Sequence, residues 1–181
     1  MNFKKEFESA LSLQNYEDQL GDQKALYELH FKKAFIEQQL PEFDKLNILV
    51  ITETWCSDST AILPVIKKLL LNHNAEIKVA LRDKNPGLME QFLTKGKKSI
   101  PIVLVLDEDY ELLMQCGPRP AVIQNIYEEN RAEIEAGIME KKDVTRKIRT
   151  FYAKDKGKVI SGAFINQLQI AMQKFDIDLM Q

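Results

Sequence analysis

Several features that mark specialised proteins are scarce or missing in this sequence. It contains two cysteines, Cys56 and Cys116, too few for the disulfide framework of a small secreted domain. No apolar run approaches the length of a membrane-spanning helix. The N-terminal residues mix charged and apolar side chains, so neither a signal peptide nor a lipid-attachment motif is visible. We therefore expect a cytoplasmic protein that contacts no membrane and whose thiols are kept reduced.

A strong charge of one sign and the common cofactor motifs are also lacking. The formal net charge is -2, and aromatic residues are not interleaved with clustered Lys and Arg, so nucleic acid is not an expected partner. There is no glycine-rich phosphate loop and no Gly-x-Ser-x-Gly elbow. The two histidines, His30 and His73, lie far apart, without cysteine or carboxylate neighbours at metal-ligand spacing. We expect neither a metal nor a cofactor.

The composition and the apolar spacing describe one compact, helix-rich domain. Hydrophobic residues make up 45% of the 181 residues and charged residues 29%. The continuous apolar run from Leu46 is typical of a strand buried on both faces. Further strands are predicted at residues 76–82, 100–106 and 111–116, the last two as a hairpin. Helices are predicted at residues 3–20, 22–40, 57–73 and 85–96, with three more after residue 120, separated near Gly137 and Lys156-Gly157.

The most informative segment is Trp55-Cys56-Ser57-Asp58-Ser59. It puts Cys56 at a strand-to-helix turn, where unpaired amides and the positive end of the helix dipole favour a thiolate over a thiol. Asp58 opposes this effect by like-charge repulsion. Ser59 stands where a second sulfur would close a disulfide, and a hydroxyl can hydrogen-bond a thiolate but cannot resolve a mixed disulfide. Cys56 is thus either a nucleophile or a partly buried cysteine without chemistry.

This segment, together with three prolines, resembles the thioredoxin superfamily. Pro64 stands where thioredoxins have the proline that bends the active-site helix, Asn85-Pro86-Gly87 opens the next helix, and Ile100-Pro101 stands at the position of the cis-proline. The resemblance implies an α/β, thioredoxin-like fold with a central mixed sheet flanked by helices. It covers residues 44–135, so that residues 1–43 and 136–181 would be N-terminal and C-terminal helical extensions of a single domain, 1–181.

The motif's detailed form is similar to that of a bacterial thioredoxin-like subfamily with a Trp-Cys-x-Asp-x motif and extra N-terminal helices. Arg82-Asp83 and Gly117-Pro118-Arg119-Pro120 support this resemblance. It implies that the loop of a cis Pro101 lies against the sulfur of Cys56. The residues that would contact a substrate are then Trp55, Ile100, Pro101, Gly117 and Arg82.

Two groups of charged residues near this site have open roles. Arg82 is placed by the resemblance at the active-site edge, where it either pairs with Asp58 or is an ordinary exposed charge. The lysines that precede Ile100 either make a basic rim or belong to a solvated loop; they are Lys95, Lys97 and Lys98.

The chain departs from thioredoxin at two positions that serve the same chemical step. Ser59 replaces the resolving cysteine, and Val50 replaces a buried aspartate that helps to deprotonate that second sulfur. Both departures argue against efficient dithiol chemistry. Cys116 is the one other thiol: the resemblance places the end of its strand near the active-site surface, but bridging requires Cα atoms within about 7 Å. Cys116 is otherwise a small buried apolar residue.

Three functions follow as hypotheses. The first is a one-cysteine thiol-redox protein in which Cys56, with Asp58 and Ser59, forms mixed disulfides with protein or glutathione thiols. The second is a non-catalytic binding module that uses the cis-proline groove. The third and weaker one is a dithiol reductase that pairs Cys56 with Cys116. The apolar residues of the terminal helices must be buried, either on the sheet or in a dimer interface.

Overall fold

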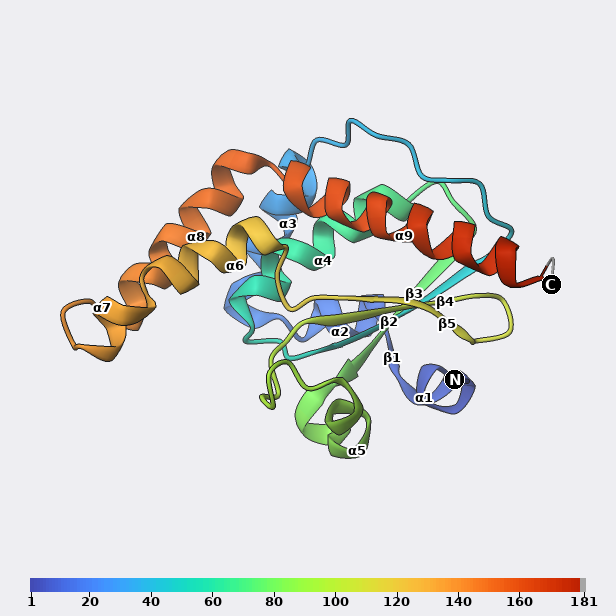
Figure 1. Ribbon diagram of the computed structural model, residues 1–181, viewed down its shortest axis with the longest axis horizontal. Helices are drawn as coiled ribbons and strands as arrows, with labels where there is room; N and C mark the ends of the chain where they lie inside the picture. The colour runs from blue at the N-terminus through green and yellow to red at the C-terminus, as the bar shows by residue number, and fades with distance from the viewer. Residues whose placement is uncertain (180–181) are drawn as a thin grey trace.

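The computed structural model describes residues 1–179, with side chains described as far as residue 174. Its centre is a mixed five-stranded sheet in the order β1-β3-β2-β4-β5 (Figure 1). The strands are β1 (Leu11–Ser12), β2 (Leu46–Thr52), β3 (Ala75–Leu81), β4 (Ile102–Leu106) and β5 (Leu112–Cys116). β2 runs parallel to β3 and antiparallel to β4, and β4 and β5 form the predicted hairpin.

The central strand β2 delivers the candidate site. Every residue from Leu46 to Thr52 is buried, as its continuous apolar run predicts. Its alternating side chains feed two hydrophobic clusters: Ile48 and Val50 belong to one, and Leu49 and Ile51 to the other. The two faces of the sheet are therefore both covered.

Helices lie on both faces of the sheet. Their bounds are α1 (Lys4–Ser9), α2 (Leu13–Asp18), α3 (Lys24–Lys33), α4 (Ser57–Leu70), α5 (Pro86–Met89), α6 (Ala121–Glu129), α7 (Arg131–Glu135), α8 (Lys141–Asp155) and α9 (Lys158–Leu179). In Figure 1, α1 and α5 lie below the sheet, and α3, α4, α6, α8 and α9 lie above it. Short 3₁₀ turns occur at Gly21–Gln23, Arg82–Lys84 and Glu90–Phe92. The expected helix at 57–73 is α4, with Pro64 inside it.

The prediction of one helix over residues 3–20 is wrong. The segment forms α1, then the two-residue strand β1, then α2. β1 pairs with the edge of β3, with Leu11 opposite Val79. Phe7 on α1 and Tyr16 on α2 are buried in different clusters. The chain must therefore pass around the sheet edge, which a continuous helix cannot do.

The second expected helix also differs, because α3 ends at Lys33 rather than near residue 40. Residues distant in the sequence form hydrogen bonds with the end of α3 and the residues that follow it. The Nζ of Lys68 donates to the carbonyl oxygens of Lys32 and Ala34, and the amide of Phe35 donates to Lys156. These bonds hold residues 34 and 35 outside the helix, which apolar spacing did not reveal.

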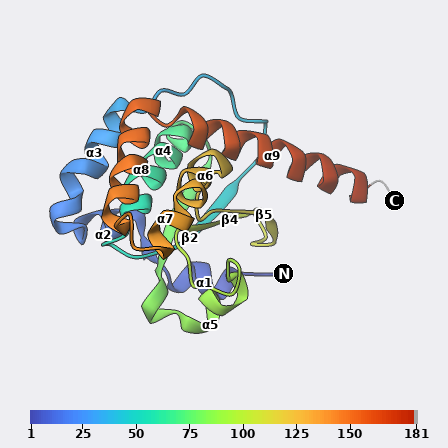
Figure 2. The same cartoon turned by 60° about the vertical axis from the view of Figure 1, so that its left-hand side comes forward.

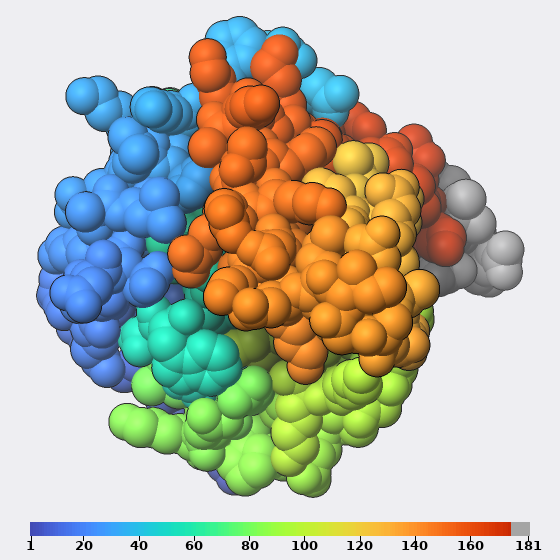
Figure 3. Space-filling view, turned by 90° about the vertical axis from the view of Figure 1, so that its left-hand side faces the viewer, coloured from blue at the N-terminus to red at the C-terminus, as the bar shows by residue number. Residues whose placement is uncertain are grey.

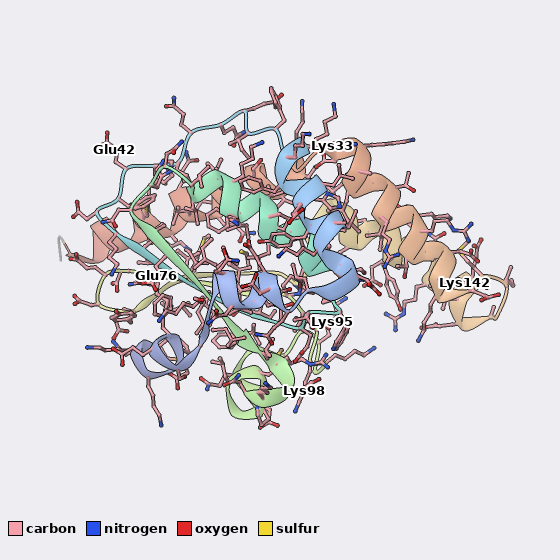
Figure 4. All side chains as sticks on the ribbon, turned by 180° about the vertical axis from the view of Figure 1, so that it is seen from behind. Lys33, Glu42, Glu76, Lys95, Lys98 and Lys142 are labelled. Atoms are coloured by element: carbon pink, nitrogen blue, oxygen red, sulfur yellow. The ribbon has the colours of Figure 1, made fainter. Side chains whose placement is uncertain are left out.

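Four helices, rather than the expected three, follow residue 120 in the described chain. The additional break is at Asn130, whose side-chain amide donates to the carbonyl of Ile126 at 2.6 Å. α6, α7 and α8 form an arm that projects beyond the sheet, and α9 returns across the sheet (Figures 1 and 2). Figure 4 shows Lys142 at the outer part of this arm and Lys33 on α3. We call α6–α8 the helical arm.

Most apolar residues expected to need burial in the terminal helices do pack on the main cluster. The buried ones are Ile148, Tyr152, Phe164 and Leu168, and the partly buried ones are Ile126, Ile134, Phe151 and Met172. Ile138 is 79% exposed, and the side chain of Phe175 lies outside those described. None of the helices described is long and apolar enough to cross a membrane.

Candidate active site around Cys56

Cys56 is the N-cap residue of α4. Its amide donates to the carbonyl of Glu53 at 3.1 Å, which closes the turn after β2. Its own carbonyl accepts from the amide and the hydroxyl of Thr60, at 3.1 and 3.0 Å. The strand-to-helix turn predicted from the sequence is confirmed, and it places the sulfur at the positive end of the helix dipole.

The cis-proline loop lies against this sulfur. The Ile100-Pro101 bond is cis, as the resemblance implied. The Sγ of Cys56 is 3.7 Å from the carbonyl oxygen of Ile100, to which the thiol can donate a weak hydrogen bond. Cys56 is only 6% exposed. The structure thus brings together three predicted site residues, Cys56, Ile100 and Pro101.

Gly117, which follows β5, packs on the cis-proline loop. Its φ is +112°, and a Cβ at this position would lie 2.2 Å from the carbonyl oxygen of Pro101. Only glycine permits both the backbone conformation and this close approach. The Gly117-Pro118 bond is also cis, which the sequence analysis did not anticipate.

Asp58 is bound by two side chains that sequence reasoning did not assign to it. The Nε of Arg119 donates to its Oδ2 at 2.9 Å, and the hydroxyl of Tyr152 on α8 donates to its Oδ1 at 2.9 Å. Burial and the charge of Asp58 raise the pKa of Tyr152. Burial lowers the pKa of Arg119, but the hydrogen bond and charge of Asp58 outweigh it and raise that pKa overall. The negative charge of Asp58, two residues after Cys56 in the chain, is therefore balanced by Arg119.

Of the two roles left open for Arg82, pairing with Asp58 is not the one that the structure shows. Arg82 donates to Asp83 at 2.8 Å and to the carbonyl of Lys98 at 3.3 Å. Its guanidinium also lies 5.1 Å from the ring centroid of Trp55, within the range of a cation–π contact. Trp55 is 58% exposed, so this pair forms an outer wall of the site.

Ser59 is fully buried and shares a hydrogen bond with the hydroxyl of Thr52 on β2. The Ser59 hydroxyl therefore bonds Thr52 rather than the sulfur of Cys56. The neighbouring hydroxyl of Tyr16 donates to the carbonyl of Glu53 at 3.3 Å. Burial, and then the charge of a Cys56 thiolate, raise the pKa of Tyr16, so it stays a donor at neutral pH.

Cys116 packs on the other face of the sheet from the cluster that contains Cys56. It pairs in register with Val103 and lines a cavity of about 280 Å³ with Ile62 and Phe164. Burial raises the pKa of its thiol to about 12. Both cysteines are free. These observations stand against a resolving role for Cys116, which stays a prediction.

Among the described residues, no cluster of three or more metal-ligating side chains is positioned to hold a metal ion. Two of the residues that shape the site were missed as such. Arg119 belongs to the Gly117-Pro118-Arg119-Pro120 segment, which signalled its proximity to Gly117. Tyr152 carried no such signal. It lies 94 residues from Asp58 in the sequence, and its spacing identified it only as one of the apolar residues of a helix.

The sheet order, the cis-proline loop against the N-cap cysteine and the proline inside the active-site helix define a thioredoxin fold with one cysteine in its motif. A family model described as Thioredoxin matches residues 5–136, and the chain belongs to that family. No curated protein matches the chain.

Two solved structures share this fold. One is an HIV epitope scaffold, with a TM-score of 0.67 and 18% identity, covering 93% of this chain and 98% of the scaffold. The other is a protein of unknown function from Pseudomonas aeruginosa, with a TM-score of 0.62 and 20% identity, covering 89% of this chain and 96% of that protein. Figure 3 looks onto the site end of the molecule.

Proposed function

We propose that this protein carries out thiol–disulfide exchange through the single active-site thiol of Cys56, with protein or glutathione thiols as its partners. The observation that carries the proposal is the position of this sulfur. Cys56 is the N-cap residue of α4 and its Sγ faces the cis-proline loop, while Arg119 and Tyr152 bind the nearby carboxylate of Asp58. Asp58 therefore opposes a thiolate less than its place in the sequence suggests.

The proposed step is one exchange. The thiolate of Cys56 attacks one sulfur of a disulfide R–S–S–R, and a bond forms between that sulfur and Sγ. The S–S bond of the substrate breaks, and its other sulfur leaves as a thiolate that takes up a proton. Cys56 is oxidised to a mixed disulfide, and one half of the substrate is reduced to a thiol. A second external thiol must release the adduct, because Ser59 cannot.

Two backbone features support substrate binding at this place. In the family the backbone beside the cis-proline pairs with an extended substrate segment, and here Gly117 lets the loop after β5 pack closely on the cis-proline loop. Trp55 and Arg82 add an exposed wall. The proposal includes membership of the bacterial subfamily with a Trp-Cys-x-Asp-x motif. It also includes a cytoplasmic location, where thiols stay reduced.

The test is adduct formation with glutathione disulfide, followed by mass spectrometry of the intact protein. The expected result is one glutathione on the wild type and on Cys116→Ser, and none on Cys56→Ser. Thiol treatment should remove the adduct. An unmodified wild type, or an adduct that survives in Cys56→Ser, would contradict the proposal.

The non-catalytic binding module is a second candidate, and one observation favours it. Cys56 is 6% exposed and its Sγ lies 3.7 Å from the carbonyl oxygen of Ile100, so an external disulfide has little access to the sulfur. Capture of a partner by Cys56→Ala at wild-type strength would favour this function. Loss of capture with the sulfur would favour exchange chemistry.

A further inference from the structure

A cavity of about 280 Å³ lies beside the cis-proline loop, between the sheet and two helices. Ile66 of α4, Val103 of β4 and Phe164 of α9 form its inner walls, and all three side chains are buried. In Figure 1, α9 crosses above β4 and β5, with α4 beside it. The described lining residues do not include Cys56, so this cavity is separate from the proposed site of thiol exchange.

Three prolines make one wall of this cavity stiff. They are Pro101, Pro118 and Pro120, and a proline ring locks the backbone angle φ near about −65°. Gly117 packs so closely on Pro101 that a Cβ at Gly117 would lie 2.2 Å from the Pro101 carbonyl oxygen. A void of this size is unusual in a close-packed interior, and a stiff wall cannot move in to fill it. The cavity is therefore preformed, as sites for small molecules usually are.

The cavity offers no free charge to a ligand. Arg119 is the one charged residue among its described lining residues, and its guanidinium already pairs with Asp58 at 2.7 Å and donates to Gln124 at 3.3 Å. The thiol of Cys116 is protonated at neutral pH, because burial raises its pKa to about 12. A charged ligand would lose its hydration here without gaining a partner, so the lining favours a neutral one.

The size of the cavity and the side chains at its edge define the ligand further. An apolar cavity of about 150 Å³ holds benzene, so a cavity of about 280 Å³ has room for roughly two fused rings. At the exposed edge, Asn166 and Gln167 of α9 present carboxamides, which both donate and accept hydrogen bonds. A ligand can therefore place one polar group at this edge and its apolar body against Phe164.

We propose that this cavity is a binding site for a neutral, largely apolar molecule the size of two fused rings, with one hydrogen-bonding group. Apolar walls that are already in place gain the burial of such a molecule without first having to rearrange. The ligand contacts Pro101 and Gly117, whose backbones pack against each other beside the site of Cys56. Binding here is independent of the exchange function proposed for Cys56.

The probe is indole, a neutral molecule of two fused rings with a single N–H donor. Its affinity is measured by isothermal titration calorimetry, and its location by the shifts of backbone amide signals in NMR spectra. Ala163→Leu tests the site, because Ala163 lines the cavity and a leucine there occupies part of it. Ala163→Val occupies less and is used as well, in case leucine disturbs folding. Ala153→Leu is the matched control, since Ala153 is exposed on α8 and is not among the described lining residues.

The wild type and Ala153→Leu should bind indole with a dissociation constant below about 1 mM, and the amide signals of Gly117 and Phe164 should shift. Ala163→Leu should weaken binding by about tenfold or more, and Ala163→Val by less. The carboxylate analogue of indole should bind about tenfold more weakly than indole, because its charge finds no partner. Absence of indole binding, binding that Ala163→Leu leaves unchanged, or equal binding of the two probes would overturn the proposal. Each of these results leaves the exchange function of Cys56 standing.

Discussion

Arg119 and Asp58 form an ion pair that joins the loop after β5 to the first turn of the active-site helix. The Nη2 of Arg119 lies 2.7 Å from Oδ2 of Asp58, and the two side chains are 24% and 9% exposed. A largely buried ion pair is favourable only where good geometry and further hydrogen bonds compensate the loss of hydration, and Tyr152 donates one such bond to Asp58. The helical arm is thereby connected to the residue two positions after Cys56.

Tyr152→Phe should therefore loosen the arm and destabilise the protein. The substitution keeps the ring, but it removes the buried hydroxyl that donates to Asp58. Hydrogen bonds to charged groups contribute about 1.5–3 kcal/mol, so the free energy of unfolding should fall by that amount. Urea denaturation measures it. Tyr127→Phe is the control, since its ring lies 5.9 Å from Arg119 and its hydroxyl does not bond Asp58; an equal loss in both variants would contradict the role of Tyr152.

Gly117→Ala should be strongly unfavourable although it adds one methyl group. The new Cβ would meet the carbonyl oxygen of Pro101, and φ at +112° is unfavourable for any side chain. The strain alone is about 1–3 kcal/mol, so the melting temperature and the reactivity of Cys56 should both fall. Gly162→Ala in α9 is the control: nothing lies within 4 Å of its Cβ, and alanine is favoured over glycine in helices. A stability of Gly117→Ala equal to that of the wild type would be inconsistent with the close packing of the two loops.

Cys116 should resist alkylation in the folded protein. Burial raises its thiol pKa to about 12, against about 8.5 for an unfolded cysteine. Because the folded pKa is the higher one, this group favours the folded state below about pH 8.5, and its contribution is lost as the pH rises from there toward 12. Iodoacetamide labelling of Cys56→Ser at pH 8, read by mass spectrometry, should be slow when folded and fast in denaturant. Fast labelling of the folded protein would reopen the resolving role of Cys116.

The elements that could be predicted are those marked by a short stretch of sequence, either an apolar run or a proline. The unbroken run from Leu46 to Ile51 identified the central strand, and Pro64 and Pro101 marked the active-site helix and the cis-proline loop. The first helices were misjudged because β1 is only two residues long, and its pairing with β3 depends on the chain crossing the sheet edge. No periodicity reports such a crossing.

The site was predictable only where its residues are neighbours in sequence or correspond to family positions. Cys56 lies against Ile100, and Gly117 packs on Pro101, as the family positions implied. The partner of Asp58 was not foreseen, because an ion pair depends on which of several arginines the folded chain brings near. The resemblance placed Arg82 near Asp58. In the structure Arg82 bonds Asp83 and packs on Trp55, and Arg119 pairs with Asp58 instead.

Ser59→Cys should turn Cys56 into half of an internal disulfide. Residues three apart on a helix have Cβ atoms about 5–6 Å apart, close enough for a small adjustment to bring the two sulfurs together. The substitution also leaves the buried hydroxyl of Thr52 without its partner, so the variant should lose about 1–3 kcal/mol of stability when reduced. After mild oxidation, intact mass spectrometry should show the loss of two hydrogens in Ser59→Cys and in Ser59→Cys with Cys116→Ser. Dithiol turnover should stay slow, because fully buried Val50 offers no acid to deprotonate the new sulfur. Loss of two hydrogens by the wild type under the same conditions would show instead that Cys56 already pairs with Cys116.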